Sequence, residues 1–420
     1  MERRFFVAIL LSIVVLYGYQ ALFVPAPQPA KTVARPPSPE PEKPPALAPV
    51  SEAPRSAATP AVAGAPATVT RQAITSEDSE REIVVETKTV QAVFTNRGGR
   101  LLHWRLKEYH DRRGEPVDLV PSEVPPEHAR PFSLVVEDSA LTTQLNTAIY
   151  KVNGNRSGLV DATGHASSVV FEFQDAAGLH ARKEFTFDPR QYIVAFSTSV
   201  MNGDRTLNPT IAWGPGLGDS GAIAGGGSYF TGNYTQPPQA IYYRDGSATR
   251  IRANNVASQP AHEGSFQFAG IDDHYFLAVA VNPGQARLEF QAVTLPGSNE
   301  TQRQLLASSI RFPQPPQRVR FFVGPKQFDQ LQSVDQAIGQ GGVFVRAINF
   351  GYFGFLAVPL LTALKWVHAF IGNWGWSIIV LTILINLAIF PLRHKSVVSM
   401  RKMQVLQPQM KAIQDRYAGL

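Results

Sequence analysis

The fold is decided by a stretch that reads Ile83-Val84-Val85-Glu86-Thr87-Lys88-Thr89-Val90-Gln91-Ala92-Val93-Phe94. It is rich in β-branched residues and largely alternates apolar with polar side chains, which is typical of strands with one buried face. Asn96-Arg97-Gly98-Gly99 follows and predicts a turn. This part of the chain therefore begins a domain built from short antiparallel strands.

Further segments of the same kind follow along the chain, separated by Gly, Pro, Asn and Asp. Long helical periodicity is absent before about residue 326. Many short strands with such turns indicate a large all-β sandwich rather than a doubly wound sheet, and we place it at residues 82–340. The predicted strands are Phe132–Val136, Val169–Phe173, Glu184–Phe187, Tyr192–Val200, Phe266–Phe268, Tyr275–Val281, Leu288–Val293 and Val319–Val323.

Upstream of this domain, Phe5 to Val24 carries no charge over twenty positions and follows Arg3 and Arg4. At 1.5 Å per residue it would span roughly 30 Å, the hydrocarbon thickness of a bilayer. We predict an uncleaved transmembrane helix at 5–24 with residues 1–4 in the cytoplasm; the alternative is a cleaved signal peptide. Residues 25–81 are rich in proline and predict an extended linker.

Composition excludes several classes of protein. The 420 residues contain no cysteine, which excludes disulfides and thiolate zinc sites. The net charge of +6, from 39 basic and 33 acidic residues, is too dilute to indicate nucleic-acid binding. We expect no enzyme activity, no metal and no cofactor, because the sequence lacks the common catalytic motifs.

Two short motifs suggest chemistry but have simpler interpretations. Gly216-Leu217-Gly218-Asp219-Ser220-Gly221 matches a dinucleotide-binding pattern, yet further glycines stand where its helix should continue, which favours a loop. Asp272-Asp273-His274 lacks further ligands at metal-binding spacing and predicts a polar turn before a strand.

The C-terminal part contains two apolar stretches, but the positions of the charges allow only one to cross the membrane. A single span returns the chain to the cytoplasm and places the following basic cluster inside, as the positive-inside rule requires. We therefore predict an amphipathic interfacial helix region at 343–372 and a transmembrane helix at 374–392. The expected anchors at the membrane surface are Lys365, Trp366, Trp374 and Trp376.

Residues 393–420 read as a basic cytoplasmic helix, with Pro408 expected to kink it. Met403, Leu406, Met410, Ile413 and Tyr417 are spaced three and four apart, as in a coiled-coil seam. A second interpretation is a methionine-rich surface that adapts to client segments. The residues expected to contact a client or the ribosome are Arg393, Lys395, Arg401, Lys402, Met403 and Met410.

Several motifs make the chain resemble the YidC membrane protein insertases, over nearly its whole length and in the same order. Those in the C-terminal part are Phe353 to Leu360, Leu364 to His368, Gly372 to Ile379, Phe390-Pro391-Leu392, Ser399 to Met403 and Leu406-Gln407-Pro408. Those in the β domain are Trp213 to Leu217, Asp273-His274-Tyr275-Phe276 and Val323-Gly324-Pro325-Lys326.

The resemblance implies a multi-pass protein of a bacterial inner membrane, with its N-terminus in the cytoplasm, residues 25–373 in the periplasm and the C-terminal segment cytoplasmic. It implies a β-sandwich of the mutarotase-like type and five further spans enclosing a hydrophilic groove, of which one lies within these residues. The implied partners are nascent membrane proteins, the Sec translocon and the lipid bilayer, with the ribosome as a further candidate.

The chain departs from the family where an arginine commonly stands five residues before Pro391; here the residue is Asn386. Because an unpaired polar side chain is costly in a membrane, we expect Asn386, with Thr382 and Ser377, to face the groove. For Thr382 and Ser377, pairing with neighbouring helices is an alternative. The rival function is a membrane-anchored periplasmic binding or scaffold module.

Overall fold

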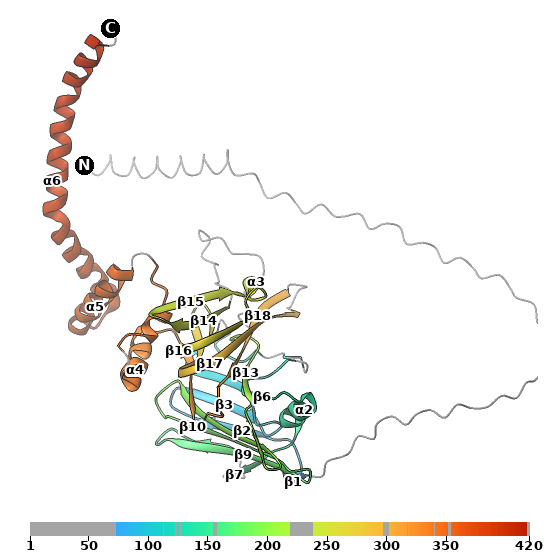
Figure 1. Ribbon diagram of the computed structural model, residues 1–420. Helices are drawn as coiled ribbons and strands as arrows, with labels where there is room; N and C mark the ends of the chain where they lie inside the picture. The colour runs from blue at the N-terminus through green and yellow to red at the C-terminus, as the bar shows by residue number, and fades with distance from the viewer. Residues whose placement is uncertain are drawn as a thin grey trace, which may run out of the picture. The chain divides into compact units, whose positions relative to one another are not determined.

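The computed structural model describes residues 73–417, except 112, 122–123, 126–127, 154–157, 219–237, 297–301, 317, 340 and 352–353 (Figure 1). The predicted helix at 5–24 and most of the linker lie outside the described residues. The remainder comprises a β domain, made of strands β1–β19 with helices α2–α4, followed by two apolar helices.

The larger of the two sheets has fourteen strands, with the path β1-β9-β10-β11-β19-β17-β16-β14-β15 and five strands attached beside it. All of its pairs are antiparallel. Its strands are β1 (Ala73–Thr75), β6 (Ser133–Val135), β7 (Lys151–Asn153), β9 (Ser167–Asp175), β10 (Leu179–Phe187), β11 (Ile193–Asn202), β12 (Arg205–Leu207), β13 (Thr210–Trp213), β14 (Gln239–Arg244), β15 (Ser247–Arg252), β16 (Ala261–Asp272), β17 (Phe276–Pro296), β18 (Gln302–Arg311) and β19 (Val319–Pro325).

The smaller sheet has five strands in the order β5-β4-β3-β2-β8. Its β2–β8 pair is parallel, and the others are antiparallel. Its strands are β2 (Glu82–Glu86), β3 (Val90–Thr95), β4 (Arg100–His110), β5 (Pro116–Asp118) and β8 (Leu159–Asp161).

Aromatic side chains pack the two sheets together. Phe94 of β3 lies 4.6 Å from Phe185 of β10 and 5.9 Å from Phe171 of β9, between ring centroids. Trp104 of β4 stacks on Phe187 at 6.2 Å. All five rings are buried. The predicted all-β sandwich is therefore confirmed, with its core between the sheets.

A lysine with no exposed surface also joins the sheets. Lys183 of β10 donates from Nζ to the carbonyls of Gly98 and Phe132, both at 2.7 Å. Burial lowers the pKa of its ammonium well below the usual 10.5. Gly98 belongs to the predicted turn between β3 and β4, so this contact fixes that turn against the larger sheet.

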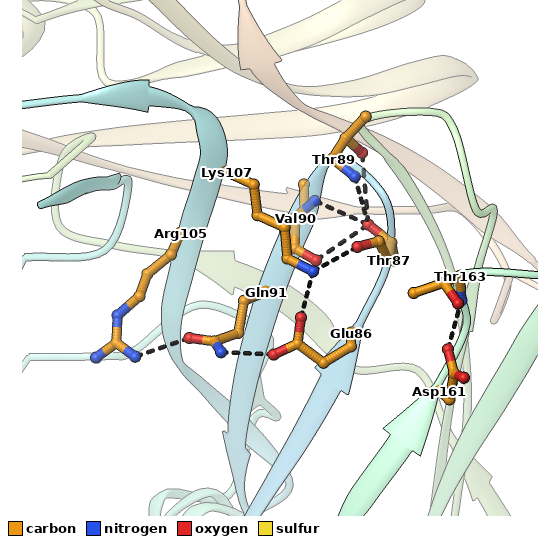
Figure 2. A network of polar contacts seen from close by, with 9 residues as sticks. All are labelled: Glu86, Thr87, Thr89, Val90, Gln91, Arg105, Lys107, Asp161 and Thr163. Atoms are coloured by element: carbon orange, nitrogen blue, oxygen red, sulfur yellow. Dashed lines mark hydrogen bonds and ion pairs between the residues drawn. The ribbon is translucent and has the colours of Figure 1, made fainter.

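The outer face of the smaller sheet is held by a polar network that crosses three strands (Figure 2). Lys107 of β4 pairs with Glu86 of β2 and donates to the Thr87 carbonyl at 2.6 Å. Gln91 of β3 bridges Glu86 and Arg105, donating to the first at 2.5 Å and accepting from the second at 2.9 Å. These charges and amides pair across neighbouring strands, which fits a structural role.

The structure contains more strands than were predicted, and it joins two predicted strands into one. The strands that no predicted segment covers, besides β14 and β15, are β1, β4, β5, β7, β8, β12, β13 and β18. The segments predicted separately at Tyr275–Val281 and Leu288–Val293 belong to one strand, β17, which pairs with β19 along its first part and with β18 along its second. The hairpin of β14 and β15 was not predicted. Its signal is the Asp245-Gly246 turn, where both residues have positive φ (52° and 82°), as two-residue hairpin turns favour.

The helices are α2 (Ser139–Thr147), α3 (Ala253–Val256), α4 (Phe328–Ile338), the 3-10 turn η2 (Phe344–Ala347), α5 (Gly354–Ile371) and α6 (Trp374–Tyr417). The predicted segments 374–392 and 393–420 share one helix, because α6 continues across both Pro391 and Pro408. A proline in a helix removes only one backbone donor, so the hydrogen bonds on either side can maintain the helix.

Candidate functional site

Helices α5 and α6 are each long and apolar enough to cross a membrane. The part of α6 suited to a membrane span is Trp374–Met400; its most apolar 18-residue window has a mean hydropathy of 2.1, and only 6% of that window is buried. At 1.5 Å per residue, the 27 residues of this part extend about 40 Å, more than a bilayer's hydrocarbon core. The surface of α6 is therefore suited to lipid or to other apolar helices.

Two of the three predicted groove residues lie together on α6. The Asn386 amide donates from Nδ2 to the Thr382 carbonyl at 2.8 Å, and the Thr382 hydroxyl donates to the Ile378 carbonyl at 2.7 Å. Both side chains are exposed. Because they are four residues apart, they share one face of the helix and form a polar spot on an apolar surface.

The third predicted residue, Ser377, has a different environment. It is fully buried and donates to the Asn373 carbonyl at 2.7 Å. Nine residues separate it from Asn386, which at 100° per residue places it about 180° around the helix. The structure therefore does not bring Ser377 to the face that carries Asn386 and Thr382.

The turn between α5 and α6 is well defined. Asn373 accepts the backbone N–H groups of Gly375 (2.9 Å) and Trp376 (3.3 Å) through Oδ1, which caps the start of α6. His368, near the end of α5, stacks on Trp374 with ring centroids 3.7 Å apart and an angle of 8°. These contacts hold the two helices at a defined corner.

Helix α5 presents an apolar face away from the rest of the protein. Phe355, Trp366 and Phe370 are 75%, 64% and 74% exposed, and their spacing places them on one side of the helix. Lys365 instead forms an ion pair with Asp329 of α4, and its Nζ lies 4.8 Å from the Phe328 ring centroid. Of the predicted anchors, Trp366, Trp374 and Trp376 are exposed, while Lys365 contacts the β domain.

The predicted client or ribosome contacts lie on the second half of α6. Arg393 and Lys395 are exposed, and Met403 is 66% exposed. The side chains of Arg401, Lys402 and Met410 are outside the described part of the structure. The role of all six residues stays a prediction.

The β domain contains two sites that chemistry could use. Asp272 is fully buried, and its carboxylate pairs with Arg250 Nε at 3.0 Å and with Lys326 Nζ at 2.7 Å. Within the described residues, no group of three or more acidic or histidine side chains is placed to hold a metal ion. Asp272 is the last residue of β16 and does not belong to the predicted polar turn; its two ion pairs join β15 to the residue that follows β19.

The second is an open cleft of about 700 Å³ on the larger sheet. The pairing register explains it: Ala212 of β13 lies beside Ser309 of β18, which lies beside Glu289 of β17. Small side chains in the middle leave a trough, and Arg287 and Glu289 line one side. This cleft could not be predicted from the sequence, because it depends on strands that are distant in sequence.

Comparison with known proteins gives two family matches that together cover most of the described structure. The family described as YidC periplasmic domain matches residues 82–363, and the family described as 60Kd inner membrane protein matches residues 366–419. The boundary between them falls inside α5, next to Lys365.

Curated relatives carry the same name. Proteins called membrane protein insertase YidC from Pelobacter propionicus and Geobacter metallireducens are each 27% identical over 99% of this chain. The alignments cover 72% and 73% of those relatives. The protein of that name from Nitratidesulfovibrio vulgaris is 29% identical over 83% of this chain and 62% of its own length.

Similarity to solved structures is weaker. A crystal structure of an active YidC insertase is 16% identical over 82% of this chain and 63% of that chain, with a TM-score of 0.26. A GalM/aldose epimerase homologue from C. elegans is 10% identical over 59% of this chain and 98% of that chain, with a TM-score of 0.30. Because the periplasmic-domain family alone matches most of the chain, this protein belongs to the YidC family of inner-membrane proteins.

Proposed function

We propose that this chain works in inserting nascent membrane proteins into the inner membrane, as the names of its relatives indicate for them. The observation that carries the proposal is the polar spot of Asn386 and Thr382 on an exposed, otherwise apolar helix. A polar side chain inside a membrane is energetically costly, so such side chains usually face water or a polar partner. We propose that the partner of this polar spot is the polar flank of a client segment.

The mechanism requires no covalent step. A hydrophilic groove beside Asn386 reduces the cost of bringing a client's polar flank part of the way into the bilayer. The client's apolar segment then passes sideways into lipid, which favours it. Asn386 is neutral, so its amide recognises the flank by hydrogen bonds rather than by charge.

We further propose that α5 lies along the membrane surface and that α6 spans the membrane. The ion pair between Lys365 and Asp329 supports this, because it ties the middle of α5 to the β domain. A spanning α5 would carry that pair toward the bilayer, where desolvation of charges is expensive. This arrangement places the β domain in the periplasm, with Arg393 and Lys395 at the cytoplasmic end.

The proposed partners follow from this arrangement. The exposed basic residues beyond Pro391 would meet clients as they leave the ribosome, and the Sec translocon would supply clients that need both systems. The N-terminal helix at 5–24 would anchor the chain with its first residues in the cytoplasm.

The test replaces the native protein in cells by variants and follows a short single-span client, whose insertion is read by protease protection in spheroplasts. Asn386→Leu is expected to impair client insertion, because it removes the amide of the polar spot. Asn386→Gln keeps an amide and should therefore support normal insertion. Leu384→Ile, about 160° around the helix, is the matched control. Normal insertion with Asn386→Leu, or in cells depleted of the protein, would contradict the proposal.

A second candidate function is favoured by the cleft on the larger sheet. The cleft suits a polar ligand, because Arg287 and Glu289 line one side and small residues form its floor. Such a site is expected in a periplasmic binding module. A ligand should raise the melting temperature of the protein, and Glu289→Ala should abolish that rise. If deletion of the β domain leaves client insertion intact, the binding role is separate from insertion.

A further inference from the structure

The loop between β16 and β17 presents an aromatic side chain that the fold does not bury. Tyr275 is 68% exposed, and its ring stands edge-on to that of His274 at 4.3 Å. Two backbone hydrogen bonds hold the loop: the Asp273 N–H donates to the Phe276 carbonyl at 2.9 Å, and the Lys326 N–H donates to the Tyr275 carbonyl at 2.7 Å. The backbone position from which the exposed ring projects is therefore held by the fold.

This loop lies at the end of the β domain from which the chain enters α4, which we call the α4 end. Phe276, the next residue, pairs with Pro325, the last residue of β19. Helix α4 begins three residues later with Phe328, whose ring lies against Lys365 of α5. A short series of contacts thus connects Tyr275 to the middle of α5.

Tyrosine is suited to the boundary between lipid and water, because its ring is apolar and its hydroxyl is polar. A tyrosine ring that is buried in the core stabilises the fold. A turn that holds the ring in solvent loses this stabilisation. The exposure of Tyr275 is explained by a partner that accommodates both its apolar ring and its polar hydroxyl. The nearest such partner, given the exposed aromatic face of α5, is the headgroup layer of the bilayer.

We infer that Tyr275, with His274 beside it, forms a second contact between the β domain and the phospholipid surface. This rests on the proposed placement of α5 along the membrane. Two points of contact, α5 and the Tyr275 loop, would restrict the tilt of the β domain relative to the membrane surface. The domain would then hold α5 in one orientation beside α6.

The register of the larger sheet supplies a matched control. Ile193 of β11 pairs with Phe322 near the α4 end, and Met201 lies eight residues further along the same strand. At about 3.3 Å per residue, Met201 is roughly 26 Å from that end. Met201 is 39% exposed, so it is an accessible apolar position on the part of the domain remote from the membrane.

The chain has no cysteine, so single cysteines can be labelled specifically. Tyr275→Cys, Met201→Cys and Trp366→Cys are each labelled with a polarity-sensitive fluorophore. The full chain is then reconstituted into phosphatidylethanolamine and phosphatidylglycerol vesicles, with and without lipids carrying a spin label at the headgroup. Circular dichroism of each variant shows that the fold is kept.

The inference predicts blue-shifted emission and quenching by spin-labelled lipid at positions 275 and 366, with neither at 201. Quenching at 366 combined with a signal at 275 equal to that at 201 would overturn the Tyr275 contact and leave the proposed position of α5 intact. Absence of quenching at all three positions would overturn both. Equal quenching at 275 and 201 would show non-specific adsorption and would also overturn the inference.

Discussion

Asp329 of α4 and Lys365 of α5 form an ion pair that joins the last helix of the β domain to the first apolar helix. The Lys365 Nζ also lies 4.8 Å from the centroid of the Phe328 ring, so the partly exposed lysine contacts one carboxylate and one aromatic face of α4. Phe355, Trp366 and Phe370 remain exposed on the other side of α5. The β domain thereby sets which face of α5 is available to lipid.

The first prediction concerns this pair. Lys365→Ala and Asp329→Ala should each loosen α5, and amide exchange in α5 should rise about two- to five-fold, since such exposed pairs contribute up to about 1 kcal/mol. Hydrogen exchange with mass spectrometry measures it. The exchanged pair, Asp329→Lys with Lys365→Asp, should restore protection. Unchanged exchange in both single variants would show that the pair does not position α5.

The second prediction concerns the buried carboxylate Asp272. Asp272→Ala leaves Arg250 and Lys326 as neighbouring, mostly buried cations without their carboxylate, so the free energy of unfolding should fall by about 3–5 kcal/mol. Chemical denaturation of the chain in detergent measures the change. Glu263→Gln is the control, because its pair with Arg287 is exposed and should contribute less than about 1 kcal/mol. Similar losses for the two variants would contradict the buried-triad interpretation.

The third prediction concerns Gly270 in β16. A Cβ there would meet the Ala278 carbonyl oxygen and would lie 2.8 Å from Val279 Cα, both backbone atoms of the paired strand β17. Gly270→Ala should therefore lower stability by about 1–3 kcal/mol or more, since the strands must move apart. Gly341→Ala is the control, because nothing lies within 4 Å of its Cβ position. Equal melting temperatures for the two variants would refute the close approach.

The fourth prediction concerns pH. The hydrogen bond from Arg81 is the main cause that lowers the pKa of Glu77 below its usual 4.5. A carboxylate with a lowered pKa stabilises the folded state above its unfolded pKa, so this contribution should be lost as the pH falls below about 4.5. Denaturant titrations at several pH values test it. Glu77→Gln should be less stable near neutral pH and lose less on acidification; an acid response identical to the parent would contradict the assignment.

Local patterns allowed much of the fold to be predicted. Strands with alternating side chains, the turn at Asn96 to Gly99 and the apolar runs of α5 and α6 are recognisable because each depends on residues close in sequence. The match of all the predicted strands to observed strands follows from this. A helix that includes Pro408 was predicted, but its continuity with the apolar segment across Pro391 was not, because a proline lowers helix stability without excluding a helix.

Long-range contacts could not be predicted. The burial of Lys183, the pairing of β19 between β11 and β17, and the Lys365–Asp329 contact all join segments far apart in sequence. All three candidate groove residues were predicted to face the groove, but in the structure only Thr382 and Asn386, which are four residues apart, share one face of α6. The burial of Ser377 depends on how α5 packs against α6, which its position in the sequence does not reveal.

The most direct measurement is site-specific photocrosslinking from position 386 of the protein in its native membrane, with a stalled nascent chain bearing one apolar segment as client. Position 384 on the far side of α6 serves as the control. We expect a crosslinked client at 386 and lipid labelling at 384. Lipid labelling alone at both positions would contradict the claim that Asn386 faces the path of the client.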